Sequence, residues 1–347
     1  MPGASRDAVD RAALDGLDVI EVQGPHARPP MLVPGNEAAL ALRLHALSYE
    51  KHMAPWLASS GYTEAALNAV AAQVCRALDE GPLSSALIRA QVTHPDAAEL
   101  MIGALVHLSL RGVIRRFPAD GRIDSSKYLY ELRHPDDRPP VDAEDDPASV
   151  VREGLRLFLQ RHGPASVDEM ADSILLTKGA IRKALAELQA ERIGVNGWTD
   201  DAWLLADDVR AWKRFDAQDD RVVLLPYRDP FVWRRRPPAV LAARPAASPV
   251  LNTELRLTPI ADITALHHHV IVAGGALVGV WEYDPKTKHV LTRVWPGDSS
   301  LRSRVAAASA DAETFIRQQV GDVSLSAVDP ALRRAKRIAF CRGRRAS

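Results

Sequence analysis

The feature that most constrains the fold of this chain is a pattern that occurs twice. In each copy, a stretch of apolar residues at helical spacing ends at a Gly-Pro dipeptide, first at Gly81-Pro82 and again at Gly163-Pro164. Glycine and proline both end helices, so each dipeptide predicts a stop. We therefore expect two units of one architecture. The two apolar stripes are Leu67, Val70, Val74 and Leu78, and Val150, Leu155, Phe158 and Leu159.

The elements predicted after the first stop follow the winged-helix order. A short helix over 84–91 precedes a longer one over 95–110, and Gly112 suits the left-handed position that ends a helix. Strands over 113–117 and 127–132 then form a hairpin. Three helices and a hairpin predict a winged-helix module over residues 67–133.

The same order is predicted after the second stop. Ser166 and Glu169 form a capping box that starts a short helix, and Thr177 starts a third helix. These elements predict a second winged-helix module over residues 147–206. Its hairpin pairs strands over 193–195 and 203–205 about a turn at either Asn196-Gly197 or Thr199-Asp200-Asp201.

The remaining residues differ in kind. Strand-like runs over 222–225, 268–273, 277–283 and 290–295 predict an antiparallel meander, closed by a helix over 309–320. The predicted fold class is α+β, with tandem winged-helix modules followed by a C-terminal antiparallel β-rich domain. Apart from the two modules, the predicted parts are a partial N-terminal winged-helix-like segment over 1–66 with a helix from Asn36 to Leu47, an acidic, proline-rich linker over 134–146, the β-rich domain over 207–330 and a basic tail over 331–347.

Composition limits the classes of function. The chain has 44 Lys and Arg residues and 44 Asp and Glu residues, so nucleic-acid binding would need local basic patches. Cys75 and Cys341 are far apart in sequence and predict reduced thiols in a bacterial cytoplasm. No apolar run reaches the roughly 20 residues that span a bilayer, and residues 1–14 do not resemble a signal peptide. We expect no contact with a membrane.

Basic side chains at the two places where winged helices contact DNA are candidate binding residues. On the third helix of the second module, Lys178 and Arg182 are four residues apart and therefore neighbours, with Lys183 beside them. The alternative is an ordinary solvated helix face. On the hairpin of the first module, the candidates are Arg115, Arg116, Arg122 and Lys127.

Two further basic clusters could contact a nucleic-acid backbone. Arg234, Arg235 and Arg236 form the first, and the tail over 331–347 forms the second. The last residues of the tail can also be interpreted as a disordered basic end.

The sequence predicts neither a metal site nor a cofactor. Adjacent residues of a strand point to opposite faces, so His267, His268 and His269 cannot converge on one ion and are interpreted as structural. The sequence contains no CxxC pair, HExxH, Walker loop or GxSxG elbow.

Three segments resemble the AlkZ-like winged-helix DNA glycosylases. Residues 224–236 resemble the family segment LLPPFDPxxWxRRR, and residues 269–281 resemble its strand pair HVVLVDGRVVGTW. Residues 163–166 resemble its GPAT entry to a winged helix. The resemblance covers residues 67–320 and implies tandem winged helices with a C-terminal β domain around DNA. It also implies excision of bulky alkylated or crosslinked purines.

The catalytic motif of that family has no counterpart here. The family aims the hydrolytic water with a Gln-x-Gln or Gln-x-Asp pair, and the first 35 residues of this chain contain neither. Met31 stands where the family usually has histidine. Gln218-Asp219-Asp220 lies between the second module and the β domain and is interpreted as a polar loop. No catalytic residue is therefore carried over.

These observations lead to one hypothesis and two alternatives. We expect a protein that binds double-stranded DNA, is related to the glycosylases and lacks glycosylase activity. The first alternative is an active glycosylase whose water is positioned by other residues or by a segment upstream. The second is a winged-helix module that binds a protein partner, which the zero net charge keeps open.

Overall fold

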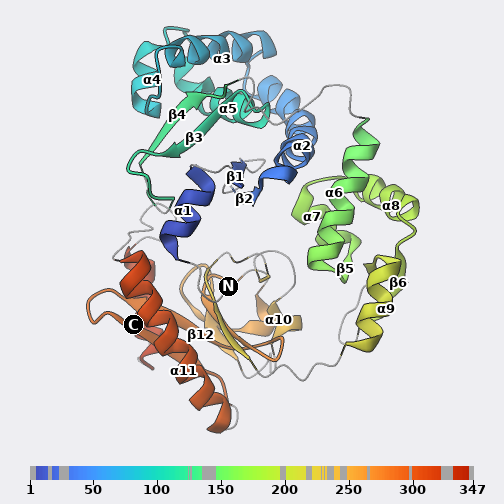
Figure 1. Cartoon of the computed structure of the whole chain (residues 1–347), viewed down its shortest axis with the longest axis vertical. Helices are drawn as coiled ribbons and strands as arrows, with labels where there is room; N and C mark the ends of the chain where they lie inside the picture. The colour runs from blue at the N-terminus through green and yellow to red at the C-terminus, as the bar shows by residue number, and fades with distance from the viewer. Residues whose placement is uncertain are drawn as a thin grey trace. The chain divides into compact units, whose positions relative to one another are not determined.

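The computed structural model divides the chain into two compact units (Figure 1). Unit 1 comprises residues 1–158 and 174–189, and unit 2 comprises residues 159–173 and 190–347. The residues described are 5–14, 18–22, 31–123, 125, 127–134, 146–195, 201–215, 221–227, 229, 231–232, 238–242, 248–263, 266–296, 299–321 and 331–343.

Unit 1 is mainly helical. It carries two short antiparallel hairpins, β1 with β2 and β3 with β4. Its elements are α1 (Arg6–Leu14), β1 (Val19–Val22), β2 (Met31–Pro34), the 3-10 turn η1 (Gly35–Glu37), α2 (Ala38–Ser59), α3 (Glu64–Leu78), α4 (Ser85–Gln91), α5 (Ala97–Leu110), β3 (Ile114–Pro118), β4 (Tyr128–Leu132), most of α6 (Pro147–His162) and α8 (Lys178–Glu187).

Helices α3 to α5 and the β3–β4 hairpin share one core. Thr63 and Ser84 cap α3 and α4, since their hydroxyls accept backbone N–H groups at 3.1 and 3.3 Å. Gly112 follows α5 with a positive φ of 66°, as the sequence predicted. The core brings together fully buried side chains from these helices and strands, among them Leu67, Val74, Ile88, Leu100 and Ile114.

Helix α2 is longer than the sequence predicted. It runs over 22 residues and passes through Pro55, and Asn36 lies in the preceding 3-10 turn and does not cap the helix. The Tyr49 hydroxyl of α2 donates a hydrogen bond to the Gly103 carbonyl of α5 at 3.2 Å. Helix α2 therefore covers part of α5.

The start signals predicted for the second set of helices are confirmed. Ser166 and Glu169 form a reciprocal capping box, with N–H to side-chain distances of 2.8 and 3.1 Å, at the start of α7 (Val167–Ile174). Thr177 caps α8, because its hydroxyl accepts the Ala180 N–H at 3.2 Å. The boundary between the two units crosses residues 147–206, so a self-contained second module stays a prediction.

Glycine is required for different structural reasons in the two Gly-Pro dipeptides. Gly81 has a φ of 131°, a backbone conformation that side chains disfavour. Gly163 is packed so tightly that a Cβ atom would lie 2.6 Å from both the Leu159 carbonyl oxygen and a Leu204 methyl. The repeated sequence is therefore not a repeated local geometry.

Unit 2 is built on an antiparallel sheet in the order β13-β12-β11-β8, which confirms the predicted meander. A second, three-stranded sheet has the order β5-β7-β6. The elements are β5 (Ala165–Ser166), β6 (Glu191–Ile193), β7 (Ala202–Leu204), α9 (Ala206–Arg214), β8 (Val222–Leu225), α10 (Pro238–Leu241), β9 (Pro249–Leu251), β10 (Leu257–Pro259), η4 (Ile260–Asp262), β11 (His269–Ala273), β12 (Ala276–Asp284), β13 (His289–Val294), α11 (Ser299–Phe315), the π-helical turn η5 (Ile316–Val320) and α12 (Ala331–Cys341).

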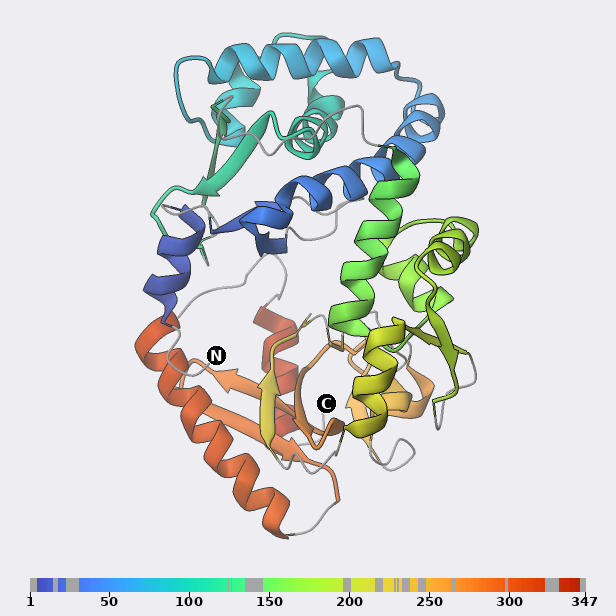
Figure 2. The same cartoon turned by 45° about the vertical axis from the view of Figure 1, so that its right-hand side comes forward.

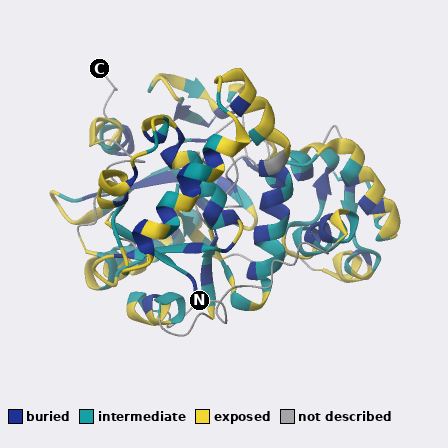
Figure 3. Cartoon of the chain, turned by 90° about the horizontal axis from the view of Figure 1, so that it is seen from above, coloured by how far each residue is buried: buried dark blue, intermediate teal, exposed yellow. Residues whose placement is uncertain are grey.

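Helices α11 and α12 cover different faces of the four-stranded sheet (Figure 2). Val305 of α11 packs with Ile271 and Trp281, whereas Phe340 of α12 packs with Val270 and other residues of the opposite face. Along the helices of the chain, buried residues alternate with exposed ones, as the colours of Figure 3 show. Helix α11 begins ten residues before the helix predicted from position 309.

Helix α12 corrects the prediction of a basic tail. Its Arg337 is only 4% exposed, and its Nε donates to Oε2 of Glu282 on β12 at 2.6 Å. Arg342 follows the helix and pairs with Asp284 of the same strand. These two arginines attach the C-terminal helix to the sheet, so they do not contribute to a free basic surface.

Candidate nucleic-acid interface

Two of the arginines predicted to contact DNA lie on strand β3 and pair with carboxylates. Arg115 forms an ion pair with Glu131, its neighbour across the hairpin on β4. Arg116 donates two hydrogen bonds to Glu21 of β1, at 2.5 and 3.2 Å, and its guanidinium lies 4.0 Å from the centre of the Tyr128 ring. Burial alone would lower the pKa of Arg116, but the bonds and charge of Glu21 outweigh it and the pKa is raised. Each of the two arginines is therefore already paired with a carboxylate.

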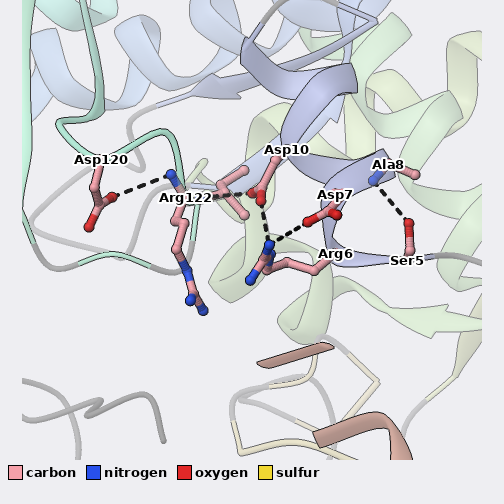
Figure 4. Close-up of polar contacts among 8 residues, drawn as sticks. Ser5, Arg6, Asp7, Ala8, Asp10, Asp120 and Arg122 are labelled. Carbon is pink, nitrogen blue, oxygen red and sulfur yellow. Dashed lines mark hydrogen bonds and ion pairs between the residues drawn. The ribbon is translucent and has the colours of Figure 1, made fainter. Parts of the chain in front are cut away.

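The other two hairpin candidates, Arg122 and Lys127, flank the tip between β3 and β4. The tip closes on itself: the Asp120 carboxylate accepts the Arg122 N–H at 3.3 Å (Figure 4). It also accepts the Ser125 hydroxyl at 3.0 Å. The Ala119 N–H donates to the Lys127 carbonyl at 2.8 Å. Lys127 is exposed and Arg122 is half-buried. The described residues of the tip thus include two basic side chains, of which Lys127 is exposed.

A groove of about 390 Å³ lies beside this hairpin, within unit 1. Its lining combines apolar and charged side chains from α1, β1 and the β3–β4 hairpin. The apolar lining includes Ala13, Leu14, Ile20 and Ile123, and the charged lining consists of Glu21, Arg115, Arg116, Glu131 and Arg133.

Helix α8 carries the three remaining described candidates. Its buried side is formed by Ile181, Ala184 and Leu185. Lys178, Arg182 and Lys183 are all exposed. Lys183 lies 4.0 Å from Glu187, a distance at which an exposed ion pair contributes little. Lys178 and Arg182 are one turn apart on the exposed side, which is the arrangement that the sequence predicted.

The third helix of the first module, α5, offers a poorer surface. It is apolar on most sides, and α2 packs over Gly103 with the Tyr49 hydroxyl and the Trp56 ring, whose nearest atom would lie 3.8 Å from an added Cβ. His107 of α5 lies beside the Tyr49 ring, and burial lowers its pKa. A helix covered in this way cannot insert fully into a DNA groove.

Several predicted features lie outside the described residues. Arg234, Arg235 and Arg236 are among them, as are residues 216–220 with the Gln-x-Asp sequence and residues 344–347 at the end of the chain. Most of the predicted linker, residues 135–145, and the turn residues 196–200 are also outside. The structure therefore does not test these predictions.

The three consecutive histidines make separate hydrogen bonds, two of them to Tyr227 and one to Leu251. The Tyr227 hydroxyl lies 3.0 Å from Nδ1 of His267, and Nδ1 of His269 accepts the Tyr227 N–H at 2.9 Å. Nε2 of His268 accepts the Leu251 N–H at 3.0 Å. Within the part of the chain that the structure describes, no group of three His, Cys, Asp or Glu side chains could hold a metal ion.

His268 makes the stability of unit 2 dependent on pH. Burial, with a contribution from the Arg337 charge, lowers the pKa of His268 to about 3. Between that pH and the ordinary value of about 6.5, the unfolded chain binds a proton that the folded protein does not. The free energy of unfolding should therefore fall as pH drops below about 6.5, by up to about 1.4 kcal/mol per pH unit from this group.

A glutamine at position 268 tests that prediction. In His268→Gln the amide oxygen can still accept the Leu251 N–H, but the group does not titrate. Denaturant unfolding at pH 7, 6, 5 and 4.5 should give a shallower loss of stability for the variant. Equal slopes for the two proteins would assign the pH dependence to other groups.

Sequence reasoning missed two carboxylates that organise this interface. Glu21, which binds Arg116, is 95 positions away from it in the sequence. Asp10 of α1 accepts the Ile123 N–H of the hairpin tip at 2.9 Å, across 113 positions. Neither pairing has a local sequence signal, since each depends on the tertiary fold.

Comparison with known proteins gives two findings. A family model described as "DNA glycosylase AlkZ-like" matches residues 1–317. Among solved structures, Streptomyces sahachiroi DNA glycosylase AlkZ is similar, with a TM-score of 0.62 and 17% sequence identity over 89% of this chain and 84% of that chain. At that identity the structural likeness shows the fold alone. No curated protein sequence matches the chain. Among the described helices, none combines the length and apolar character that crossing a lipid bilayer requires.

Proposed function

This chain belongs to the AlkZ-like DNA glycosylase family, and from that premise we propose that it binds double-stranded DNA without excising a base. The observation that carries the proposal is the exposed face of α8, where Lys178 and Arg182 lie one turn apart over a buried apolar side. Such a face can contact phosphates or base edges. The tip of the β3–β4 hairpin, with Arg122 and Lys127, supplies a second contact.

The proposed architecture behind these contacts is a pair of winged helices, over 67–133 and 147–206, followed by the β-rich domain over 207–330. Three features support it: the helix order α3-α4-α5 before a hairpin, the confirmed caps of α7 and α8, and the likeness in fold to a DNA glycosylase. In this arrangement α8 is the recognition helix of the second module and β3–β4 is the wing of the first.

The absence of base excision is proposed from the chemistry of the site. Hydrolysis of an N-glycosidic bond requires groups that aim water at a carbon on which positive charge develops. The first 35 residues lack the Gln-x-Gln or Gln-x-Asp pair of the family, and the exposed Met31 of β2 cannot orient water. A role in regulation or in DNA-damage recognition fits binding without excision.

Incubation with a duplex that contains 7-alkylguanine tests the proposal. We expect a mobility shift of the duplex at low salt and no free base in the products. Release of the alkylated base would establish the second candidate, an active glycosylase, which the family match favours.

A third outcome separates nucleic-acid binding from protein binding. If no duplex, damaged or undamaged, is shifted at low salt, the result favours the second alternative, a winged-helix module that binds a protein. The net charge of the chain is zero, so no overall attraction to DNA adds to the local contacts. The binding assay must therefore include low salt concentrations, at which local contacts to phosphates are strongest.

A further inference from the structure

Helix α1 is bonded to the tip of the β3–β4 hairpin. Oδ1 of Asp10 accepts the Ile123 N–H at 2.9 Å, and Ile123 directly follows Arg122 (Figure 4). Asp10 is only 8% exposed, and its other carboxylate oxygen lies 3.2 Å from Nε of Arg6 on the same helix. A buried carboxylate is costly unless it is hydrogen-bonded and neutralised, and both conditions are met here.

The hairpin tip needs such a support. The strands β3 and β4 pack on the core of α3 to α5 through residues such as Ile114 and Leu132, whereas residues 119–121 at the tip are exposed and outside that core. The bonds of Asp120 close the loop on itself, but they do not fix its direction. The Asp10 bond joins the loop to α1, whose Ala13 and Leu14 also line the adjacent groove.

We propose that Asp10 is a positioning residue, which orients the hairpin tip so that Arg122 and Lys127 contact phosphates of bound DNA. The inference rests on the proposed function. A charged side chain that is already oriented loses less conformational freedom when it binds a phosphate. The affinity for DNA therefore depends on the Asp10 bond that orients the tip as well as on the charges of Arg122 and Lys127.

The test compares variants of Asp10 in the full chain. Asp10→Ala should weaken duplex affinity by about fivefold and lower the slope of log affinity against log salt by one to two, since about one unit is expected for each phosphate contact. Asp10→Asn should keep more of the affinity and of the salt slope than Asp10→Ala does, because its amide oxygen still accepts the Ile123 N–H, although its NH2 group no longer pairs with Arg6. Asp7→Asn is the matched control: Asp7 is on the same helix, pairs with Arg6 and is 62% exposed.

A double-mutant cycle distinguishes positioning from a general structural role. Arg122→Ala should reduce the salt slope by about one in the unmodified protein and have little further effect in Asp10→Ala. Additive effects would overturn the inference. If Asp10→Ala does not fold, Asp10→Leu fills the same space without an acceptor and takes its place in the cycle.

The possible failures are distinguishable. If the unmodified protein binds no duplex, the proposed function fails and this inference fails with it. If the unmodified protein binds and a folded Asp10→Ala binds equally well with the same salt slope, the inference alone is wrong.

Discussion

Replacing Lys178 and Arg182 together by alanine is expected to weaken the binding of duplex DNA by about a hundredfold at low salt. Each side chain would lose a hydrogen bond from a charged donor to a phosphate, worth about 1.5 kcal/mol or more, and 1.4 kcal/mol corresponds to tenfold. The slope of log affinity against log salt should fall by about two. Fluorescence anisotropy of a labelled duplex at several salt concentrations measures both quantities.

Replacing Lys178 and Arg182 should leave the free energy of unfolding nearly unchanged. Lys178 is the first residue of α8, where the positive end of the helix dipole disfavours a cation. The matched control replaces Arg210 and Lys213 of α9 by alanine. Both residues are exposed, so this double variant loses the same charge from a different helix. Equal losses of affinity in both double variants would indicate a general charge effect. An unchanged salt slope in the α8 variant would remove that helix from the interface.

Arg337→Met is expected to lower the free energy of unfolding by about 3–5 kcal/mol, because it removes the arginine from the buried Glu282 carboxylate, whose other neighbour of possible opposite charge, His269, lies 3.6 Å away. Arg337 and Glu282 have side chains that are 4% and 2% exposed, and they join α12 to the central strand β12. Urea unfolding followed by circular dichroism measures the loss. A loss below about 1 kcal/mol would show that the carboxylate finds another partner or that α12 does not stabilise the sheet.

Two companion variants separate charge from packing. Arg333→Met changes an exposed arginine of the same helix and should shift stability by no more than about 0.5 kcal/mol. Combining Arg337→Met with Glu282→Gln should recover part of the loss, since a neutral amide is less costly to bury than a carboxylate. No recovery would mean that the lost contacts of the arginine stem dominate.

The parts of the fold that could be predicted are those that depend on nearby residues. Thr63, Ser84 and Thr177 bond to backbone groups three positions away, so their role is visible in the sequence. The antiparallel order of β11, β12 and β13 follows from short turns between consecutive strands.

The parts that could not be predicted depend on partners distant in sequence. The sequence places basic residues on the hairpin, but it does not show that Arg116 is bound by the carboxylate of Glu21, which comes from a different element. Helix α12 did have a signal: Arg337, Phe340 and Cys341 occur at helical spacing and are its buried residues. The same segment is rich in arginine and lysine, a composition that is also typical of a solvated basic tail, so the sequence alone favours either structure.

The paired arginines of strand β3 also affect how DNA would approach this protein. An arginine that is paired with a glutamate acts on a distant duplex as a dipole and not as a single positive charge. The electric field of a dipole decreases more steeply with distance than the field of a single charge. Arg115 with Glu131 and Arg116 with Glu21 are two such dipoles. They contribute little to the capture of a duplex from solution and act only at contact, where a phosphate can compete with the carboxylate for the guanidinium. In the proposed complex, this strand would therefore contribute to discrimination between bound sites more than to the speed of association.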